Sequence, residues 1–295
     1  MQIFSSCKDA IDDCIKTRSF SIAHLYNDNK PLDMHLHDCY EIYYSISGGK
    51  QFLIDNAFYD ISPGDIFFIN QYESHCIAQI NEKTHERIVL SIHPSFLEKI
   101  SSDATDLNHC FKFREMPNPH RLHLTPEEQK RFTYHTHKIV TSSGYGSDLL
   151  SISFFCELMV FLNQTFAANC ENQETAEPVS YHTLVDDVLS YINQNIQTSL
   201  TIEEMAAHFY LSSSYLCRIF KATTQTTINK YITAKRISIS KSLLAQGYSV
   251  MEACEQCGFN DYSNYLKAFT KAVGISPKKY AKFNSSVYTD PHSKN

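Results

Sequence analysis

The stretch CGFNDYSNYLKAFTKAVGISPKKY, residues 257–280, decides how the C-terminal part of the chain folds. Gly258 and Gly274 each follow a helical run, at a position where glycine adopts the left-handed backbone that ends a helix. Between them Tyr265 and Phe269 stand four residues apart, so they share one face of a helix. The stretch therefore predicts a helix between two glycine turns, with an aromatic face buried in a core.

A second copy of this arrangement lies upstream. The tetrapeptides TIEE (201–204) and SVME (249–252) are both capping boxes, in which a hydroxyl side chain and a glutamate three residues later each accept a hydrogen bond from the other's exposed backbone N–H. Each box is followed by another helical pattern, SSSYLCRIFKATT (212–224) in the first copy and the quoted stretch in the second. A helical run at about 228–246 joins them. The sequence thus predicts two helix-turn-helix units connected by a helix.

Such a unit commonly places its second helix in the major groove of DNA, where residues near the N-terminus of that helix meet base edges. Two units on a rigid connecting helix can reach successive major grooves about 34 Å apart, so one chain can read a long asymmetric site. The charge is divided accordingly: residues 180–295 hold 12 Lys and Arg against 8 Asp and Glu, a net charge of +4, whereas residues 1–179 carry −10. This asymmetry suggests two domains with different partners, and the basic half is compatible with DNA.

Residues 200–283 resemble the DNA-binding domain of the AraC/XylS type of transcription regulator. The resemblance runs over about 85 residues without gaps through LTIEEMA, SSSYLCRIFKATT, INKYITAKRISISKSLL and the quoted stretch, whose GFNDYSNYLKAF and VGISPKKY are the most specific parts. The chain departs from the family pattern at a few positions: Gln225 replaces Gly, Ser240 replaces Ala, Ala253 and Cys254 replace Ile-Ala, and Ala281 replaces a frequent Arg. These departures suggest altered packing in the second unit, without loss of the fold.

The resemblance also implies which side chains face DNA. By position in the motif, the base-facing residues are Ser213, Ser214, Cys217 and Arg218 in the first reading helix and Asp261, Tyr262, Leu266 and Lys267 in the second. Apart from the motif, the basic residues Lys221, Lys271, Lys278 and Lys279 are candidates for phosphate contacts. Arg218 is the strongest candidate, because arginine can donate two hydrogen bonds to guanine O6 and N7. Other interpretations stay open: Ser212 and Asp261 suit helix N-caps, Cys217 suits a packed position, and the lysines suit solvated faces.

The N-terminal third of the sequence has the pattern of β-strands in place of helices. Between residues 20 and about 95, short stretches rich in Ile, Tyr, Phe and Val alternate with turn signals such as SGG (47–49) and SPGD (62–65). Several short strands at this spacing predict a small all-β barrel or sandwich. In the segment MHLHDCYEIYYSISGG (34–49), the odd-numbered residues from 35 to 43 share one face of a strand, so we expect them to point into the barrel.

The same segment contributes to a set of four good metal ligands. His35, His37 and Glu41 follow the spacing His-x-His-x3-Glu-x6-Gly, and His75 stands eleven residues after Gly64. These motifs resemble those of the cupin fold, a small double-stranded β-barrel or jelly roll. The resemblance implies that the three histidines and the glutamate occupy its metal-ligand positions.

Three interpretations of this set stay open. Three histidines and a carboxylate suit a divalent transition metal such as Zn, Mn, Fe or Ni. The same groups, with Tyr43 stacking on a ring, suit a metal-free pocket for a sugar or related metabolite, as the sensor domains of AraC-type regulators imply. A purely structural role is the third. The second motif is imperfect, since Asn70 and Tyr72 replace Pro and Gly, and this weakens the metal interpretation.

The expected domain organisation has five parts: a cupin-like effector-sensing domain at 1–120, a helical packing or dimerisation segment at 121–170, a linker at 171–180, the tandem helix-turn-helix domain at 181–285 and a tail at 286–295. The helical segment opens with Thr125 and Pro126 at the N-cap and first helical positions. Its apolar stripe from Leu150 to Phe166 is wide, so it fits either packing on the barrel or the interface of a homodimer. The linker is polar, contains proline and lacks large apolar residues.

Composition limits the remaining classes. Of 295 residues, 43% are hydrophobic and 20% are charged, which is typical of a soluble globular protein. The sequence has no uninterrupted run of 18 apolar residues and no signal-peptide pattern, so we expect a cytoplasmic protein without a membrane partner. The ten cysteines are scattered, and the single CxxC pair, Cys254 and Cys257, does not make a zinc ribbon.

Together these features predict a DNA-binding transcription regulator and not an enzyme, with double-stranded promoter DNA, a small-molecule effector and RNA polymerase as partners. The resemblance implies that activation is the commoner mode. No cofactor is certain beyond the divalent transition metal that the barrel could hold. The alternatives are a metal-dependent cupin sensor or enzyme fused to a DNA-binding domain, and a ligand-independent regulator. A DNA-repair methyl acceptor needs a reactive cysteine in a Pro-Cys-His-Arg context, and no cysteine here has one.

Overall fold

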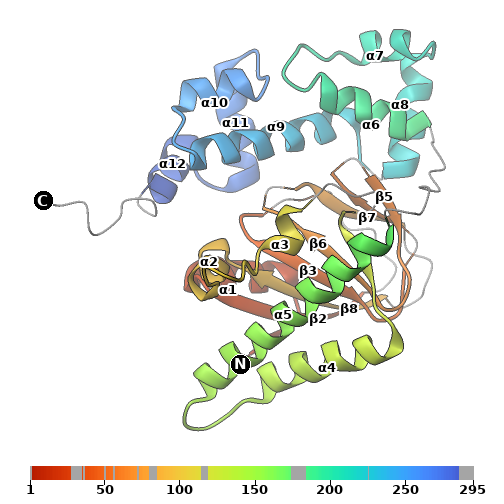
Figure 1. The fold of residues 1–295 in the computed structure, drawn as a ribbon. Coiled ribbons are helices and arrows are strands. Elements are labelled where there is room, and N and C mark those ends of the chain that lie inside the picture. Colours follow the sequence, from red (N-terminus) through yellow and green to blue (C-terminus); the bar gives the residue numbers. More distant parts are fainter. Residues whose placement is uncertain are drawn as a thin grey trace, which may run out of the picture.

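The computed structural model describes residues 2–27, 35, 37–49, 51–55, 57–71, 73–79, 85–113, 119–173, 184–224 and 226–285. The predicted tail, most of the predicted linker, and the family departures at Tyr72 and Gln225 lie outside these residues. Figure 1 shows a β domain with its own helices and, gathered at one end of it, the C-terminal helices, of which α6 and α8 lie next to β5 and β7.

The β domain consists of two sheets. One has six strands in the order β1-β2-β8-β3-β6-β9, and the other has three in the order β5-β4-β7. The strands and the helix between the first two of them are β1 (Ile3–Phe4), α1 (Cys7–Thr17), β2 (Phe20–Asn27), β3 (Tyr40–Ser45), β4 (Gln51–Ile54), β5 (Ala57–Asp60), β6 (Asp65–Ile69), β7 (His75–Gln79), β8 (His85–Ile92) and β9 (Arg121–His123). The predicted N-terminal β domain is confirmed, but the sheets formed by the described strands do not close into a barrel.

Strand β3 serves two cores because its side chains alternate between the faces of its sheet. Ile42 and Tyr44 pack against the helices that cover the six-stranded sheet, while Tyr43 packs between the two sheets with Phe52 and Phe67. All six residues of β3 are buried. Since successive side chains of a strand point to opposite faces, this register also directs the odd-numbered neighbours of Tyr43 into the interior.

Besides α1, the described part of the β domain contains four helices: α2 (Pro94–Ile100), α3 (His109–Lys112), α4 (Pro126–Thr141) and α5 (Ser147–Gln173). Helix α4 begins as the sequence predicts, since Thr125 is its N-cap and forms a capping box with Glu128. Helix α5 packs on the outer face of the six-stranded sheet, where Phe155 and Phe166 are buried beside Phe20 and Phe68. The helical segment therefore covers the β domain.

Helix α5 is apolar enough to raise the question of a membrane span. Ser147–Asn169 has a mean hydropathy of 1.5 and is long enough to cross a bilayer, by length and composition alone. Its larger apolar side chains lie in the same core as the six-stranded sheet, which accounts for the composition without a membrane. Leu149, Leu150 and Val160 are 68%, 48% and 38% exposed, so part of the apolar stripe stays on the surface.

The C-terminal helices form the two predicted units. They are α6 (Leu184–Gln194), α7 (Ile202–His208), α8 (Ser213–Thr224), α9 (Ile228–Ala245), α10 (Val250–Gln256), α11 (Tyr262–Val273) and α12 (Pro277–Ser285). Both predicted capping boxes are present, Thr201 with Glu204 at α7 and Ser249 with Glu252 at α10. Helix α9 connects the units, as Figure 1 shows.

Each unit has its own apolar core. Phe220 of α8 is fully buried in the first, and Tyr265 and Phe269 of α11 are fully buried in the second. Gly258 marks a close approach between the units: its φ is 88°, and a Cβ atom there would lie 2.3 Å from the carbonyl oxygen of Ile196. Only glycine fits that position without displacing the end of the first unit.

Candidate DNA-reading helices and a buried ligand site

The predicted DNA-facing residues of α8 lie on its accessible side. Ser214, Arg218 and Lys221 are exposed, whereas Ser213 and Cys217 are half-buried. The Arg218 guanidinium lies 5.3 Å from the ring centre of Tyr215, a cation–π contact that limits its orientations. Ser212 Oγ accepts a hydrogen bond from the Tyr215 backbone N–H at 3.3 Å, as a helix cap does.

The predicted residues of α11 are arranged in the same way. Asp261 is the N-cap of α11, and its carboxylate accepts a 2.6 Å hydrogen bond from the Asn264 backbone N–H. Tyr262 is 40% exposed, and Lys267 and Lys271 are also exposed, while Leu266 packs partly into the core of the second unit. The capping interpretation of Asp261 thus has a structural basis, and its carboxylate is already engaged.

His35, His37, Glu41 and His75, here called the histidine cluster, come together inside the β domain. The ligand nitrogens of the three histidines lie within 4.8 Å of one another. Glu41 Oε2 lies 3.0 Å from His37 Nε2 and 3.8 Å from His75 Nε2. The backbones of His35 and His75 form an antiparallel bridge, so the first histidine is held against the start of β7.

Hydrogen bonds on the far side of two imidazoles fix which nitrogen faces the cluster. His75 Nδ1 donates to the backbone oxygen of Glu73 at 2.9 Å, and His37 Nδ1 donates to the backbone oxygen of Cys39 at 2.9 Å. In both rings Nε2 is therefore directed at the Glu41 carboxylate. A backbone carbonyl behind the distal nitrogen is how proteins orient histidines that bind metals.

Burial and charge set different protonation states within the cluster. Burial and the neighbouring His35 lower the pKa of His75 to about 3, so this ring is neutral. Burial opposes a charge on His37, but Cys39 and Glu41 outweigh it and raise the pKa of His37 well above its ordinary value. Burial likewise opposes ionisation of Glu41, and the hydrogen bond from His37 nevertheless lowers its pKa to about 2. The cluster combines an imidazolium–carboxylate pair with a neutral imidazole.

The side chains of the cluster are of the types that bind a metal ion, and their ligand atoms lie nearly close enough together to do so. His75 Nε2 is buried and has no hydrogen-bond partner among the described residues, which leaves a lone pair directed into the cluster. Nitrogens bound to one zinc ion at about 2.0–2.1 Å lie roughly 3.4 Å apart, so the rings would need to move together by about 1 Å. The residues fit a transition metal once His37 gives up its proton.

A small cavity adjoins the cluster. It has a volume of about 10 Å³, room for about one water molecule, and its lining consists of Cys7, His35, Glu41, Tyr43, Phe52, His75, Ile77, Arg87 and Val89. The cavity thus brings together the predicted effector residues, with His37 just behind Glu41. It is far smaller than the roughly 300–1,000 Å³ of a pocket for a drug-sized ligand.

Sequence reasoning missed three polar residues beside the cavity. Arg87 of β8 is only 2% exposed and lines it together with Cys7. His85, two residues earlier on the same strand, hydrogen-bonds to the Tyr43 hydroxyl at 2.6 Å. The sequence HERIVLSI does contain a sign of this site. Arg87 is a charged residue within an apolar strand, and charged residues are rarely buried unless they are paired.

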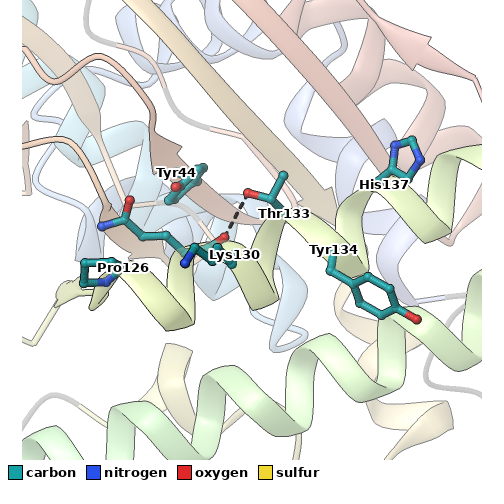
Figure 2. A pocket seen from close by; sticks show the side chains of 7 residues that line it. Tyr44, Pro126, Lys130, Thr133, Tyr134 and His137 are labelled. Atoms are coloured by element: carbon teal, nitrogen blue, oxygen red, sulfur yellow. Dashed lines mark hydrogen bonds between the residues drawn. The ribbon is translucent and has the colours of Figure 1, made fainter.

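A larger hollow lies elsewhere. A surface groove of about 610 Å³ runs along α4 and is lined by Tyr44, Pro126, Gln129, Lys130, Thr133, Tyr134 and His137. Figure 2 shows these side chains. It lies on the helix-covered face of the six-stranded sheet and shares no residue with the cavity. Thr133 Oγ1 donates to the Gln129 carbonyl oxygen at 2.9 Å, so that polar group is engaged within α4. The groove contains none of the residues predicted for an effector.

Comparison with known protein families gives two matches. Residues 20–129 match the model of the AraC-like ligand binding domain, and residues 205–282 match that of a helix-turn-helix domain. The first match contains the whole histidine cluster, and the second contains α8 and α11, the candidate reading helices.

Individual relatives are similar over different lengths. The melibiose operon regulatory protein of Escherichia coli K12 is 35% identical over 101 residues, which are 34% of this chain and 33% of that protein. The chain is thus matched to about a third of that regulator's length. The HTH-type transcriptional activator RhaR of Escherichia coli is 23% identical over 268 residues, covering 88% of this chain and 91% of that protein. Among solved structures, a ToxT variant from Vibrio cholerae is 14% identical with a TM-score of 0.38, covering 90% of this chain and 97% of that one.

Proposed function

Since the chain belongs to the AraC family of helix-turn-helix transcription regulators, we propose that it activates transcription when a ligand occupies its histidine cluster. It is a DNA-binding regulator with a ligand-binding domain, and not an enzyme. The observation that carries the proposal is the convergence of four ionisable side chains in the interior of that domain. Buried charged groups are costly unless they are paired, so such a cluster points to binding.

The DNA contacts we propose are those of the two reading helices. Ser213, Ser214, Cys217, Arg218 and Lys221 would serve the first helix, and Asp261, Tyr262, Leu266, Lys267 and Lys271 the second. The exposure of most of these side chains supports the proposal. Asp261 and Leu266 fit it least well, because one caps its helix and the other packs into the core.

Activation and its partners form the next part of the proposal. The similarity to a transcriptional activator over most of both chains favours activation over repression. We therefore propose promoter DNA and RNA polymerase as partners in the cytoplasm. The predicted division into a sensing domain at 1–120, a helical segment at 121–170, a linker at 171–180 and a DNA-binding domain at 181–285 is part of the same proposal.

A sugar or related metabolite is the first effector class we propose. A carboxylate and imidazoles can hydrogen-bond to hydroxyl groups, and Tyr43 offers an aromatic ring beside them. The similarity to a melibiose operon regulator supports this class. A sugar does not fit a cavity of about 10 Å³, so binding requires the two sheets to separate around the cluster.

A divalent transition metal is the second candidate, and a specific observation favours it. His75 is neutral, is oriented by Glu73, and directs an unpartnered nitrogen at the cluster. His35, His37 and Glu41 would complete a three-histidine, one-carboxylate set of the kind that binds Zn, Mn, Fe or Ni. The small cavity suits an ion better than a sugar.

Metal content decides between the two classes. Tag-free protein purified without chelator would be analysed by mass spectrometry beside His37→Ala and, as a matched control, His109→Ala, which removes an exposed histidine of α3. About one equivalent of a single transition metal, lost only in His37→Ala, supports the metal candidate. Protein free of metal, even after incubation with Zn²⁺ and desalting, refutes it. Thermal shifts with a sugar panel then test the first class.

A homodimer is the last part of the proposal. Leu149, Leu150 and Val160 of α5 remain exposed although the rest of its apolar stripe packs on the sheet. A second copy of this helix would cover them, and most soluble oligomers are symmetric homodimers.

A further inference from the structure

In the described part of the chain, two ion pairs join the β domain to the C-terminal helices, and both use lysines of α9. Asp55, at the turn between β4 and β5, pairs with Lys235, and Asp38, just before β3, pairs with Lys241. The two lysines are six residues apart, which is about 9 Å along a helix. Helix α9 also links the two helix-turn-helix units (Figure 1). Through the two ion pairs, the β domain therefore contacts the connecting helix at two points.

The Asp55 contact belongs to a broad interface with the first unit. Tyr231, one turn before Lys235, donates its hydroxyl hydrogen to the Asp55 carbonyl oxygen at 2.8 Å. Leu53 of β4 and Cys76 of β7 lie in the same apolar cluster as the core of the first unit. Apolar burial and polar contacts together therefore fix the first unit on the three-stranded sheet.

The Asp38 contact reaches the second unit instead. Lys241 is only 3% exposed, and its Nζ lies 5.6 Å from the ring centre of Tyr280. Ile237 and Leu244, its neighbours on α9, are members of the second unit's apolar core. Among the described residues, that core contains no residue of the β domain. Lys241 is thus buried within the second unit, and Asp38 of the β domain is its ion-pair partner across the interface.

Asp38 is the residue next to His37 in the chain, and so it adjoins the proposed ligand site. It lies between His37, a member of the histidine cluster, and Cys39, whose carbonyl oxygen accepts the Nδ1–H hydrogen bond of His37. Its own carbonyl oxygen accepts a 2.9 Å hydrogen bond from Gln71 Nε2. Asp38 is therefore part of the short loop that sets the position of the His37 ring, and a shift of that ring displaces it.

We propose that the Asp38–Lys241 ion pair couples the histidine cluster to the second helix-turn-helix unit, while the Asp55–Lys235 pair anchors the first. This rests on the proposed ligand site. A ligand that pulls His37 inward would move Asp38 and change the orientation of the second reading helix relative to the first. The reading residues Arg218 and Lys267 are exposed in this arrangement, so coupling acts through orientation and not by covering them.

The coupling can be tested without any ligand. Hydrogen–deuterium exchange would be measured on the full chain for wild type, Lys241→Met and the matched control Lys235→Met. We expect Lys241→Met to speed exchange at least threefold both in residues 37–43 and in α10–α12, and Lys235→Met to leave both regions unchanged. Unchanged exchange at 37–43 in Lys241→Met overturns the proposal.

Exchanging the two charges distinguishes an effect of the lost ion pair from general destabilisation caused by the substitution. The double variant Asp38→Lys with Lys241→Asp keeps opposite charges facing each other, so we expect it to restore at least part of the wild-type exchange at 37–43. Failure of the swap to restore any protection would show that the effect comes from lost packing of Lys241 and would overturn the proposal.

Reciprocity gives a ligand-dependent test. If the pair couples the two sites, Lys241→Met must change the affinity of the cluster for its ligand, whereas Lys235→Met must not. With Zn²⁺ as the probe in calorimetric titrations, we expect a change of at least threefold in Lys241→Met alone. Equal affinities in all three proteins overturn the coupling. Absence of Zn²⁺ binding to wild type refutes the metal candidate, and the ligand-free exchange then decides the coupling.

Discussion

Among the residues that we propose contact DNA, Arg218 has the side chain best suited to hydrogen-bond to a base. It is exposed near the middle of α8 and is oriented by the Tyr215 ring, 5.3 Å away. We expect Arg218→Ala to weaken binding to the specific promoter site by about 1–3 kcal/mol, because a bidentate contact to guanine is worth that much in discrimination. Fluorescence anisotropy with promoter DNA and with random DNA of equal length measures the difference.

A phosphate contact would behave differently. Lys221→Ala, on the same helix and also exposed, should weaken binding to both DNAs by a similar factor and reduce the salt dependence. If Arg218→Ala lowers both affinities equally, as expected for Lys221→Ala, then Arg218 contacts phosphate and does not read bases.

His85 makes the β domain sensitive to acid. Burial, with Arg87 nearby, lowers the pKa of His85 to about 4, from 6.5. Since the folded pKa lies below the unfolded one, the neutral ring contributes stability that is fully present above about pH 6.5 and is lost progressively as the pH falls from about 6.5 to about 4. The contribution is on the order of 3 kcal/mol.

Urea unfolding at pH 7 and pH 4.5 tests this contribution. The free energy of unfolding of wild type should fall more between the two values than that of His85→Gln, in which no imidazole takes up a proton. His109→Gln, which replaces an exposed histidine, should fall as much as wild type. An equal fall in wild type and His85→Gln would contradict the assignment.

Among the elements, α9 and α11 are joined by a buried hydrogen bond between their side chains. Ser240 stands where alanine is usual, and its hydroxyl lies 2.7 Å from the Tyr265 hydroxyl in the core of the second unit. The departure is compensated, because the two buried hydroxyls satisfy each other. This accounts for one of the altered positions that the sequence indicated.

Removing that hydrogen bond should destabilise the second unit. Ser240→Ala leaves the buried Tyr265 hydroxyl without its partner, so we expect a loss of about 1–3 kcal/mol in the free energy of unfolding, measured by urea denaturation. Ser263→Ala, at an exposed position of α11, serves as the control and should cost less than about 0.5 kcal/mol. The double variant Ser240→Ala with Tyr265→Phe should recover most of the loss, and no recovery would assign it to packing.

At the scale of the whole molecule, the exposed part of α5 is the surface through which we propose that the chain dimerises. Leu150→Glu with Val160→Glu places charges on the exposed apolar surface while the buried face keeps Phe155 and Phe166. We expect wild type to be a dimer and this variant a monomer at micromolar concentration in sedimentation equilibrium. Glu157→Gln, an exposed change on the same helix, should remain dimeric. A monomeric wild type would exclude the α5 interface.

Much of the local structure could be predicted from the sequence because it depends on residues a few positions apart. The capping boxes at Thr201 and Ser249 and the glycine at 258 are each read from a short window, and the structure contains all of them. The strand register that buries Glu41 follows from alternation in the same way. These features depend on residues only three or four positions apart, so they do not depend on how the rest of the chain folds.

The sequence by itself therefore determined the two helix-turn-helix units, the β domain and the residues of the histidine cluster. The tertiary structure alone decided that the described sheets do not close into a barrel, that Arg87 and Cys7 line the cavity of about 10 Å³, and that Asp38 pairs with Lys241. Such contacts join residues up to about 200 positions apart in the sequence. They follow from how sheets and helices pack against each other, and no short window of sequence contains that packing.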